Sequence, residues 1–325
     1  QPSHSLRVSI EADRFFPEVQ VKAPEPPQLT RNPNLDLLGL AAARDLADRH
    51  LGDASLYGPR TAEWWTTGKA LHQVAGWVAS EGDGHLTSLP LLNLDESCTR
   101  EDIMAYFDNT WTLTEQLFAS LQGEATFCMQ PYHQLRHPLI FYYGHVAALY
   151  INKLRLAGLI DQPIDPYFEA LFETGVDEMT WDDLSQSATQ WPKVDEVTAY
   201  RRKVYETVRG VIETHAGLLD HHASLPEKRP LWALAMCFEH ERIHLETSSV
   251  LIRELPQPLV VRPEGWVAHH SSVPESDVFS PTAGVDYPRN DLVRVAAGTV
   301  TLGKPREVPS YGWDNEYGEA TRQVP

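Results

Sequence analysis

The sequence predicts a mainly α-helical protein built around a four-helix bundle. Four segments of about 20 residues or more place apolar side chains at helical spacing. They are separated by longer connections, as in a bundle with a long crossover. Alternating, valine-rich segments typical of strands begin only after Pro256. We therefore expect a helical bundle followed by a smaller unit that contains β-strands.

The four bundle helices are expected over residues 99–121, 137–159, 194–215 and 229–255. Thr99 is a good N-cap residue, and Asp102 three positions later makes a weak analogue of a capping box. The second helix has proline in its first turn and nears its end at Gly158, which is ordinary helix punctuation. The fourth helix must stop before Pro256.

Segments on both sides of the bundle have a different character. The proline-rich residues 1–33 predict an extended arm. Helical periodicity over 35–50 and 61–80 predicts two further helices, the second with Thr61 as its N-cap. PLVVRP, GWVAHH and VRVAAGTVTLG predict strands beyond the bundle. We divide the chain into an N-terminal arm with a helical extension, the bundle, and a linker with an incomplete second domain, over residues 1–90, 91–257 and 258–325.

Composition narrows the classes of partner. The chain has 27 Lys and Arg against 45 Asp and Glu, a formal net charge of −18, which opposes binding to nucleic acid or anionic membranes. No apolar run reaches the ~18 residues of a membrane span. The three cysteines form no disulfide framework, so we expect a cytoplasmic protein. Because the chain starts at Gln1 and stops within TRQVP, we expect it to be part of a longer polypeptide.

His240 and His244 form the first candidate metal site. Side chains at i and i+4 share one helical face with Cβ atoms about 6 Å apart, so both imidazoles can reach one ion. Burying two imidazoles without a partner would be costly, and their face belongs inside the bundle. This face comprises Ala233, Met236, Cys237, His240, His244, Thr247 and Leu251.

His145 is the best candidate for a third ligand. It lies on an apolar face of the 137–159 helix, and the adjacent Gly144 permits close approach of another helix. His133 and His137 are nearer the helix entrance, where capping or solvent contact is the commoner role. Three neutral imidazoles leave positions open on an octahedral metal ion, which indicates catalysis, whereas structural zinc normally has a fourth ligand. Affinity order favours zinc over ferrous iron, so the spacing does not identify the metal.

The same residues satisfy HExxH, the zinc-protease signature in which Glu241 would be the general base. The extended protease form also needs glycine and histidine further along the helix, where this chain has Thr247 and Val250. Glu264, a candidate downstream ligand, falls in a proline-broken segment. The protease interpretation is therefore the weaker one.

Three separate strings resemble one known family. LRHPLIFYYGHVAALYINKL, TGVDEMTWDDL and EHERIHLETSSVLIREL are similar to the N-terminal region of the 5-histidylcysteine sulfoxide synthases of ovothiol biosynthesis, relatives of the ergothioneine-pathway sulfoxide synthases. That family joins a DinB-like four-helix bundle to a formylglycine-generating-enzyme-like domain of mixed α/β structure. VRVAAGTVTLG and YGWDNEYGEA resemble the opening of the second domain, so the similarity spans about 90–325.

The resemblance implies non-haem Fe(II) bound by His145, His240 and His244. It implies that cysteine, histidine and O2 are the substrates, in a pocket completed beyond Pro325. Two alternatives share the three histidines: a zinc hydrolase or a DinB-type thiol transferase, and a bundle that metal only stabilises.

Glu241 and Glu246 are candidates for hydrogen bonding to the metal-binding histidines and so orienting them. Glu246 lies about 200° around the helix from His244, away from the metal face, with Arg242 at i−4. An ion pair is therefore its more expected role, and support of an iron ligand is the alternative.

Overall fold

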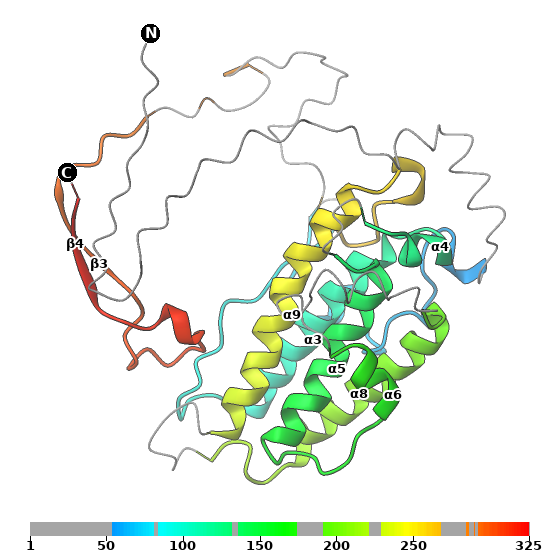
Figure 1. Cartoon of the computed structure of the whole chain (residues 1–325), viewed down its shortest axis with the longest axis horizontal. Helices are drawn as coiled ribbons and strands as arrows, with labels where there is room; N and C mark the ends of the chain where they lie inside the picture. Colours follow the sequence, from blue (N-terminus) through cyan, green and yellow to red (C-terminus); the bar gives the residue numbers. More distant parts are fainter. Residues whose placement is uncertain are drawn as a thin grey trace, which may run out of the picture.

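The computed structural model describes residues 54–80, 84–131, 136–173, 191–220, 229–267, 284–285, 289 and 292–324. Within these ranges the protein is mainly α-helical, which confirms the expected fold class. Four long helices run side by side as a bundle (Figure 1): α3 (Arg100–Ala119), α5 (Leu139–Leu156), α8 (Val194–Thr214) and α9 (Pro230–Arg253). None of the helices in these ranges combines the length and apolarity needed to cross a membrane.

The remaining elements are short. The helical ones are η1 (Ala54–Leu56), η2 (Leu71–Gln73), α4 (Glu124–Cys128), α6 (Pro166–Leu171), η5 (Gln257–Leu259) and η6 (Asp314–Glu316). The strands are β1 (Trp77–Val78), β2 (His85–Leu86), β3 (Gly298–Leu302) and β4 (Ala320–Val324).

Local signals set the ends of the long helices. The Thr99 hydroxyl accepts a hydrogen bond from the Asp102 amide at 3.1 Å, and the Asp102 carboxylate accepts one from the Thr99 amide at 3.0 Å, so the capping box forms. Gly158 follows α5 with φ of +71°, a conformation that glycine adopts without strain. All four helices begin and end within three residues of the predicted limits.

Aromatic side chains and one buried cation fill the centre of the bundle. Phe107 stacks on Tyr205 with ring centroids 5.2 Å apart. The Arg201 guanidinium is fully buried between the rings of Trp111 and Tyr143, at 4.2 and 4.6 Å from their centroids. This cation–π sandwich joins α8 to α3 and α5.

The helix predicted over 61–80 is wrong. The segment forms turns, the single-turn η2 and the two-residue β1, which pairs antiparallel with β2. Gly68 and Gly76 have φ of +66° and +92°, which interrupts a right-handed helix. The apolar periodicity instead reflects packing against α3, where the Trp64 indole donates to the Glu115 carbonyl at 3.1 Å. The helix predicted over 35–50 lies outside the described residues.

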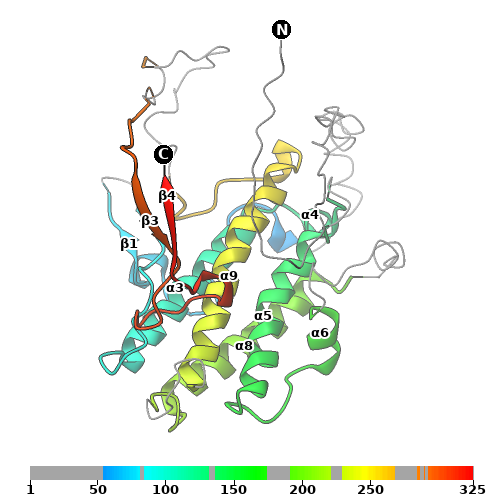
Figure 2. The same cartoon turned by 60° about the vertical axis from the view of Figure 1, so that its left-hand side comes forward.

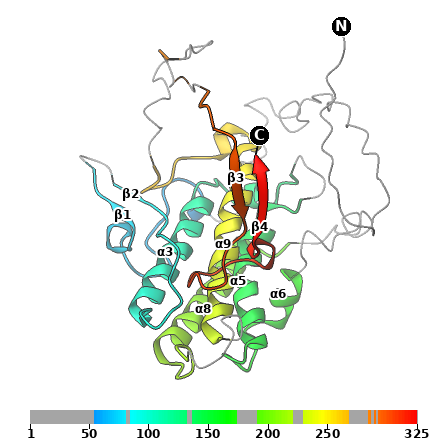
Figure 3. The same cartoon turned by 90° about the vertical axis from the view of Figure 1, so that its left-hand side faces the viewer.

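β3 and β4 of the C-terminal segment stand apart from the bundle, as Figure 1 shows most clearly and Figures 2 and 3 show from other sides. β3 and β4 form an antiparallel pair, in register from Gly298 opposite Val324 to Leu302 opposite Ala320, so a strand does form within VRVAAGTVTLG. No strand forms in PLVVRP, where η5 and one bridge from Val260 to Leu121 occur instead. The described part of GWVAHH contains no strand either.

One aromatic contact attaches this segment to the bundle. The Tyr311 ring is buried 5.0 Å from that of Trp232 on α9, measured between centroids. The Leu94 amide, before α3, donates to the Pro309 carbonyl at 2.7 Å. By contrast, several apolar side chains of the segment are exposed: Val293, Val295, Val300 and Leu302.

Candidate metal centre

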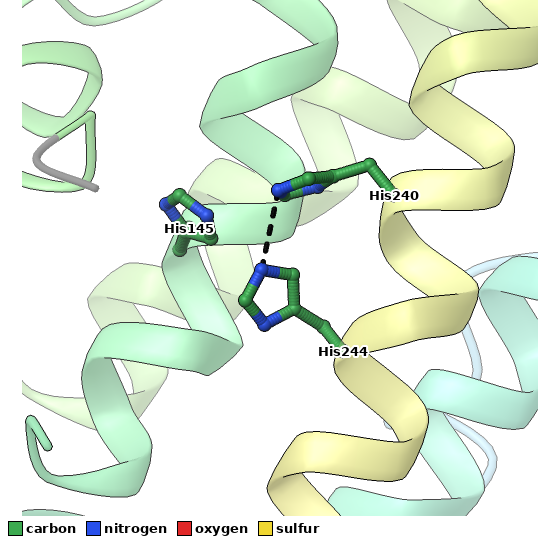
Figure 4. Close-up of side chains that lie close together, drawn as sticks. All are labelled: His145, His240 and His244. Carbon is green, nitrogen blue, oxygen red and sulfur yellow. Dashed lines mark hydrogen bonds between the residues drawn. The ribbon is translucent and has the colours of Figure 1, made fainter. Parts of the chain in front are cut away.

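The interface between α5 and α9 brings three histidines together (Figure 4). The helices run in opposite directions, because His145 lies beside His240 and His244 whereas Tyr150, further along α5, packs on Phe238. The His145 ring centroid lies 5.0 Å from that of His240 and 4.7 Å from that of His244. One potential ligand atom from each of the three residues lies within 4.8 Å of the others.

Hydrogen bonds orient two of the imidazoles. His145 Nδ1 lies 2.6 Å from the Phe172 carbonyl oxygen, and because that oxygen only accepts, Nδ1 carries the proton. His244 Nδ1 lies 3.3 Å from the Thr247 hydroxyl, which itself contacts the His244 carbonyl at 3.5 Å. Both arrangements leave Nε2 available as a metal ligand, and partners of this kind fix the tautomer of metal-binding histidines.

His240 completes a set of donors that fits a metal ion. Its Nε2 lies 3.2 Å from Nε2 of His244, and its buried Nδ1 has no hydrogen-bond partner in the described part of the chain. Two imidazole lone pairs at this separation repel each other unless a proton or a cation lies between them. Nitrogen ligands about 2.1 Å from one ion are themselves roughly 3 Å apart, so the observed spacing suits two ligands of one metal.

Electrostatics keep all three imidazoles uncharged. Burial lowers the pKa of His240 to about 2, with the charges of His244, His145 and Lys153 acting in the same direction. Burial likewise lowers the pKa of His244 to about 3 and lowers that of His145. Neutral imidazole is the form that binds metal, so the site needs no proton release at neutral pH.

Aromatic residues wall the site on the α5 side. The Phe141 ring stacks on that of His145 at 5.1 Å, and the Tyr142 ring lies 5.7 Å from that of His244. A Cβ added at Gly144 would lie 2.4 Å from the Phe172 ring. Gly144 therefore permits the close approach that places the Phe172 carbonyl against His145.

Glu241 and Glu264, the two glutamates of the protease alternative, are both engaged elsewhere. Glu241 is fully buried and accepts a hydrogen bond from the Tyr150 hydroxyl at 2.7 Å. A carboxylate held there is badly placed to act as the base of a zinc protease. Glu264, the downstream ligand of the protease alternative, uses its carbonyl to accept from the Gln116 amide at 2.9 Å.

The expected ion pair between Glu246 and Arg242 does not form. Glu246 is exposed and pairs with no described residue. Arg242 points toward α3, where it covers the Tyr106 ring at 3.9 Å, and it donates to the carbonyl of Leu89, which precedes α3, at 2.8 Å. This partly buried position, against a ring and a carbonyl, is more favourable for the guanidinium than an exposed ion pair with Glu246, because exposed ion pairs contribute little to stability.

Sequence reasoning missed two groups that orient the ligands. Thr247, at i+3 from His244, was identified only as part of the apolar stripe, although its spacing was a usable signal. The Phe172 carbonyl has no sequence signal, because a backbone oxygen is defined only by tertiary approach. His133 and the acidic string TGVDEMTWDDL lie outside the described residues.

Comparison with known proteins agrees with this architecture. Residues 106–248 match the DinB superfamily, a span that contains all three histidines. The chain is 29% identical over 198 residues to Ergothioneine biosynthesis protein 1 of Neurospora crassa, covering 56% of this chain and 20% of the relative. It is 29% identical over 122 residues to the protein of the same name in Schizosaccharomyces pombe, covering 35% of this chain and 15% of the relative. The chain thus spans about a fifth or less of the length of these relatives.

Proposed function

We propose that this chain belongs to a non-haem Fe(II)- and O2-dependent sulfoxide synthase that joins cysteine to the imidazole ring of histidine, as in ovothiol biosynthesis. The observation that carries the proposal is the convergence of three neutral imidazoles from two helices on one point. His145, His240 and His244 would hold the metal. The relatives named for ergothioneine biosynthesis support a role in sulfur and histidine chemistry.

The three imidazoles suit a catalytic iron ion with open coordination positions better than a structural metal whose ligands all come from the protein. Three imidazoles supply only three bonds and no negative charge, which leaves positions for substrates on a six-coordinate ion. When bound, Fe(II) supplies the redox chemistry that activates O2 and the thiol. The set also binds zinc, so the metal has to be measured.

The stoichiometry balances with one molecule of O2. Histidine loses the hydrogen of one ring carbon, cysteine loses its thiol hydrogen, and a C–S bond forms, which is a two-electron oxidation. Transfer of one oxygen atom to the sulfur takes two further electrons. O2 accepts all four, one atom entering the sulfoxide and the other leaving as water with the two hydrogens.

The protein's part is to hold and shield the reactants. Hydrogen bonds from His145 to the Phe172 carbonyl and between His244 and the Thr247 hydroxyl fix two rings, so that these imidazoles need no reorganisation. Phe141 and Tyr142 lie against His145 and His244 and would limit the access of water to a bound metal ion.

The test is product formation with two imidazole substrates. The full-length protein that contains this chain is loaded with Fe(II) and mixed with cysteine, O2 and either histidine or its Nα-trimethylated form, and products are identified by mass. We expect a sulfoxide conjugate of histidine, whose mass equals histidine plus cysteine plus O2 minus water. A conjugate of only the trimethylated substrate would assign the chain to the reaction for which its relatives are named. Hydrolysis of a dipeptide by the zinc form without O2 would support the hydrolase alternative.

A further inference from the structure

One cation near the metal centre, Lys153, has no side-chain partner among the described residues. It lies in the last turn of α5 and is half-buried, and its ammonium forms no hydrogen bond or ion pair with any residue that the structure describes. The neighbouring cations are all engaged: Arg155 with the Glu169 carboxylate, Arg242 with the Leu89 carbonyl and Arg136 with the Tyr142 hydroxyl.

The helix register places Lys153 about 80° around α5 from His145, and its charge acts on Cys237 and His240 of α9. It lies eight residues beyond His145, about 12 Å along the helix axis, and three residues beyond Tyr150, which contacts Glu241 at 2.7 Å. Because α5 and α9 are antiparallel, its stem lies opposite the turn of α9 that contains Cys237. Its four-carbon side chain can then extend back toward His240.

Two electrostatic effects agree with this position. Burial raises the pKa of the Cys237 thiol, and the Lys153 charge opposes that rise. The same charge contributes, after burial and the other two histidines, to the lowered pKa of His240. The ammonium therefore lies within electrostatic range of both residues on α9.

The charge of the loaded site calls for an anionic ligand. Three neutral imidazoles leave a divalent ion its full charge, and Lys153 adds another. The glutamates nearest the triad on α9 bind neither the histidines nor Lys153 in the described part of the chain: Glu241 accepts from the Tyr150 hydroxyl, Glu239 accepts from the Tyr106 hydroxyl, and Glu246 is exposed. A ligand that carries negative charge would therefore balance the metal ion and Lys153.

We propose that Lys153 binds the carboxylate of the amino-acid thiol that enters the metal centre. This inference rests on the proposed function. Three single bonds separate the sulfur of a β-thiol amino acid from its carboxylate carbon, a span of roughly 4 Å. If the thiolate binds the metal at about 2.3 Å, the carboxylate of the same molecule comes within reach of the Lys153 ammonium on α5.

The experiment compares two thiols on a spectroscopic metal. The chain is loaded with Co(II) without O2, and the thiolate-to-cobalt absorption is followed while L-cysteine or cysteamine, which lacks the carboxylate, is added. In the wild-type chain cysteine should bind about tenfold more tightly than cysteamine, the value of one hydrogen bond to a charged group. Lys153→Met should remove this preference by weakening cysteine alone, and Lys153→Arg should restore most of it.

Arg155→Met is the matched control. It removes a cation two residues away that pairs with Glu169, with an Nη1 to Oε2 distance of 3.6 Å, and should leave the preference intact. Unchanged preference in Lys153→Met, with normal cobalt binding, would overturn the inference and leave the metal centre standing. A wild-type chain that binds no cobalt would overturn both, so the two failures are distinguishable.

Discussion

His240 and His244 show how burial keeps candidate metal ligands uncharged. Their lowered pKa values of about 2 and about 3 mean that the folded chain keeps both rings neutral at pH values where free histidine is charged. The unfolded chain protonates them near pH 6.5. Protons therefore bind preferentially to the unfolded state below that pH, and the free energy of unfolding must fall as the pH falls.

The first prediction concerns this pH dependence. In the metal-free chain each such histidine should lower the free energy of unfolding by about 1.4 kcal/mol for each pH unit below pH 6.5. The double variant His240→Gln, His244→Gln should therefore lose stability less steeply between pH 6.5 and pH 5. Urea unfolding with a chelator present measures both slopes. Equal slopes would show that the imidazoles are not buried as described, and the comparison cancels effects of other groups such as the buried Glu115, whose pKa burial raises to about 7.

The second prediction concerns Thr247. Thr247→Val keeps the shape of the side chain but removes the oxygen 3.3 Å from His244 Nδ1. Losing such a partner typically weakens metal binding ~10- to 100-fold. Thr247→Ser retains the hydroxyl and should bind nearly normally. Competition with a chromophoric chelator gives the affinities, and equal affinity in the valine and serine variants would exclude an orienting role.

Among the elements, α5 and α6 are packed closely enough to set the position of one ligand. A Cβ at Gly144 would overlap the Phe172 ring at 2.4 Å, whereas a Cβ at Gly210 on α8 meets nothing within 4 Å. Both glycines lie inside helices. The same substitution should therefore have opposite effects at the two positions.

The third prediction follows from this contrast. Gly210→Ala should stabilise the chain by about 0.5–1 kcal/mol, because alanine is the better helix former. Gly144→Ala should destabilise it by about 1–3 kcal/mol through overpacking and should also weaken metal binding, because Phe172 moves away from His145 Nδ1. Thermal unfolding and metal titration of the two variants test this. Normal metal affinity in Gly144→Ala would mean that the Phe172 carbonyl does not orient His145.

The elements also show which features a sequence can predict. The Thr99 cap, Gly158 and the i, i+4 histidines are local signals, so the long helices and the pair on α9 were predictable. His145 followed from its apolar face and the need for a third ligand. The conformation of the 61–80 segment was not predictable, because its apolar periodicity arises from the burial of residues such as Trp64 against α3 and not from a helix. The partner of Arg242 was missed for the same reason: its ring and carbonyl acceptors come from elements distant in sequence.

In the whole molecule, segments on both sides of the bundle are attached to it by a few buried contacts. Near the N-terminal side, Glu115 on α3 accepts a hydrogen bond from the Thr66 amide at 3.0 Å. At the other end, the segment containing β3 and β4 contacts α9 through Tyr311 and Trp232 at 5.0 Å. Since the strands themselves are mostly exposed, Tyr311 should contribute much of the attachment.

The fourth prediction tests this attachment. Tyr311→Ala should make residues 292–324 at least about tenfold more sensitive to limited proteolysis, because local opening becomes easier. The helical circular dichroism should remain, since Tyr311 lies outside the four bundle helices. Tyr167→Ala removes an exposed tyrosine on α6 and serves as the control. Equal cleavage rates in the two variants would show that other contacts hold the segment.

The central claim is that His145, His240 and His244 bind catalytic Fe(II), and the most direct measurement is an anaerobic iron titration with elemental analysis of the purified chain. We predict one iron per chain in the wild type, and an affinity lowered at least ~10- to 100-fold when any one of the three histidines is replaced by alanine. His72→Ala, which changes an exposed histidine, should bind iron normally. Full iron binding by His145→Ala, or a wild-type chain that holds zinc and takes up no added iron, would contradict this assignment.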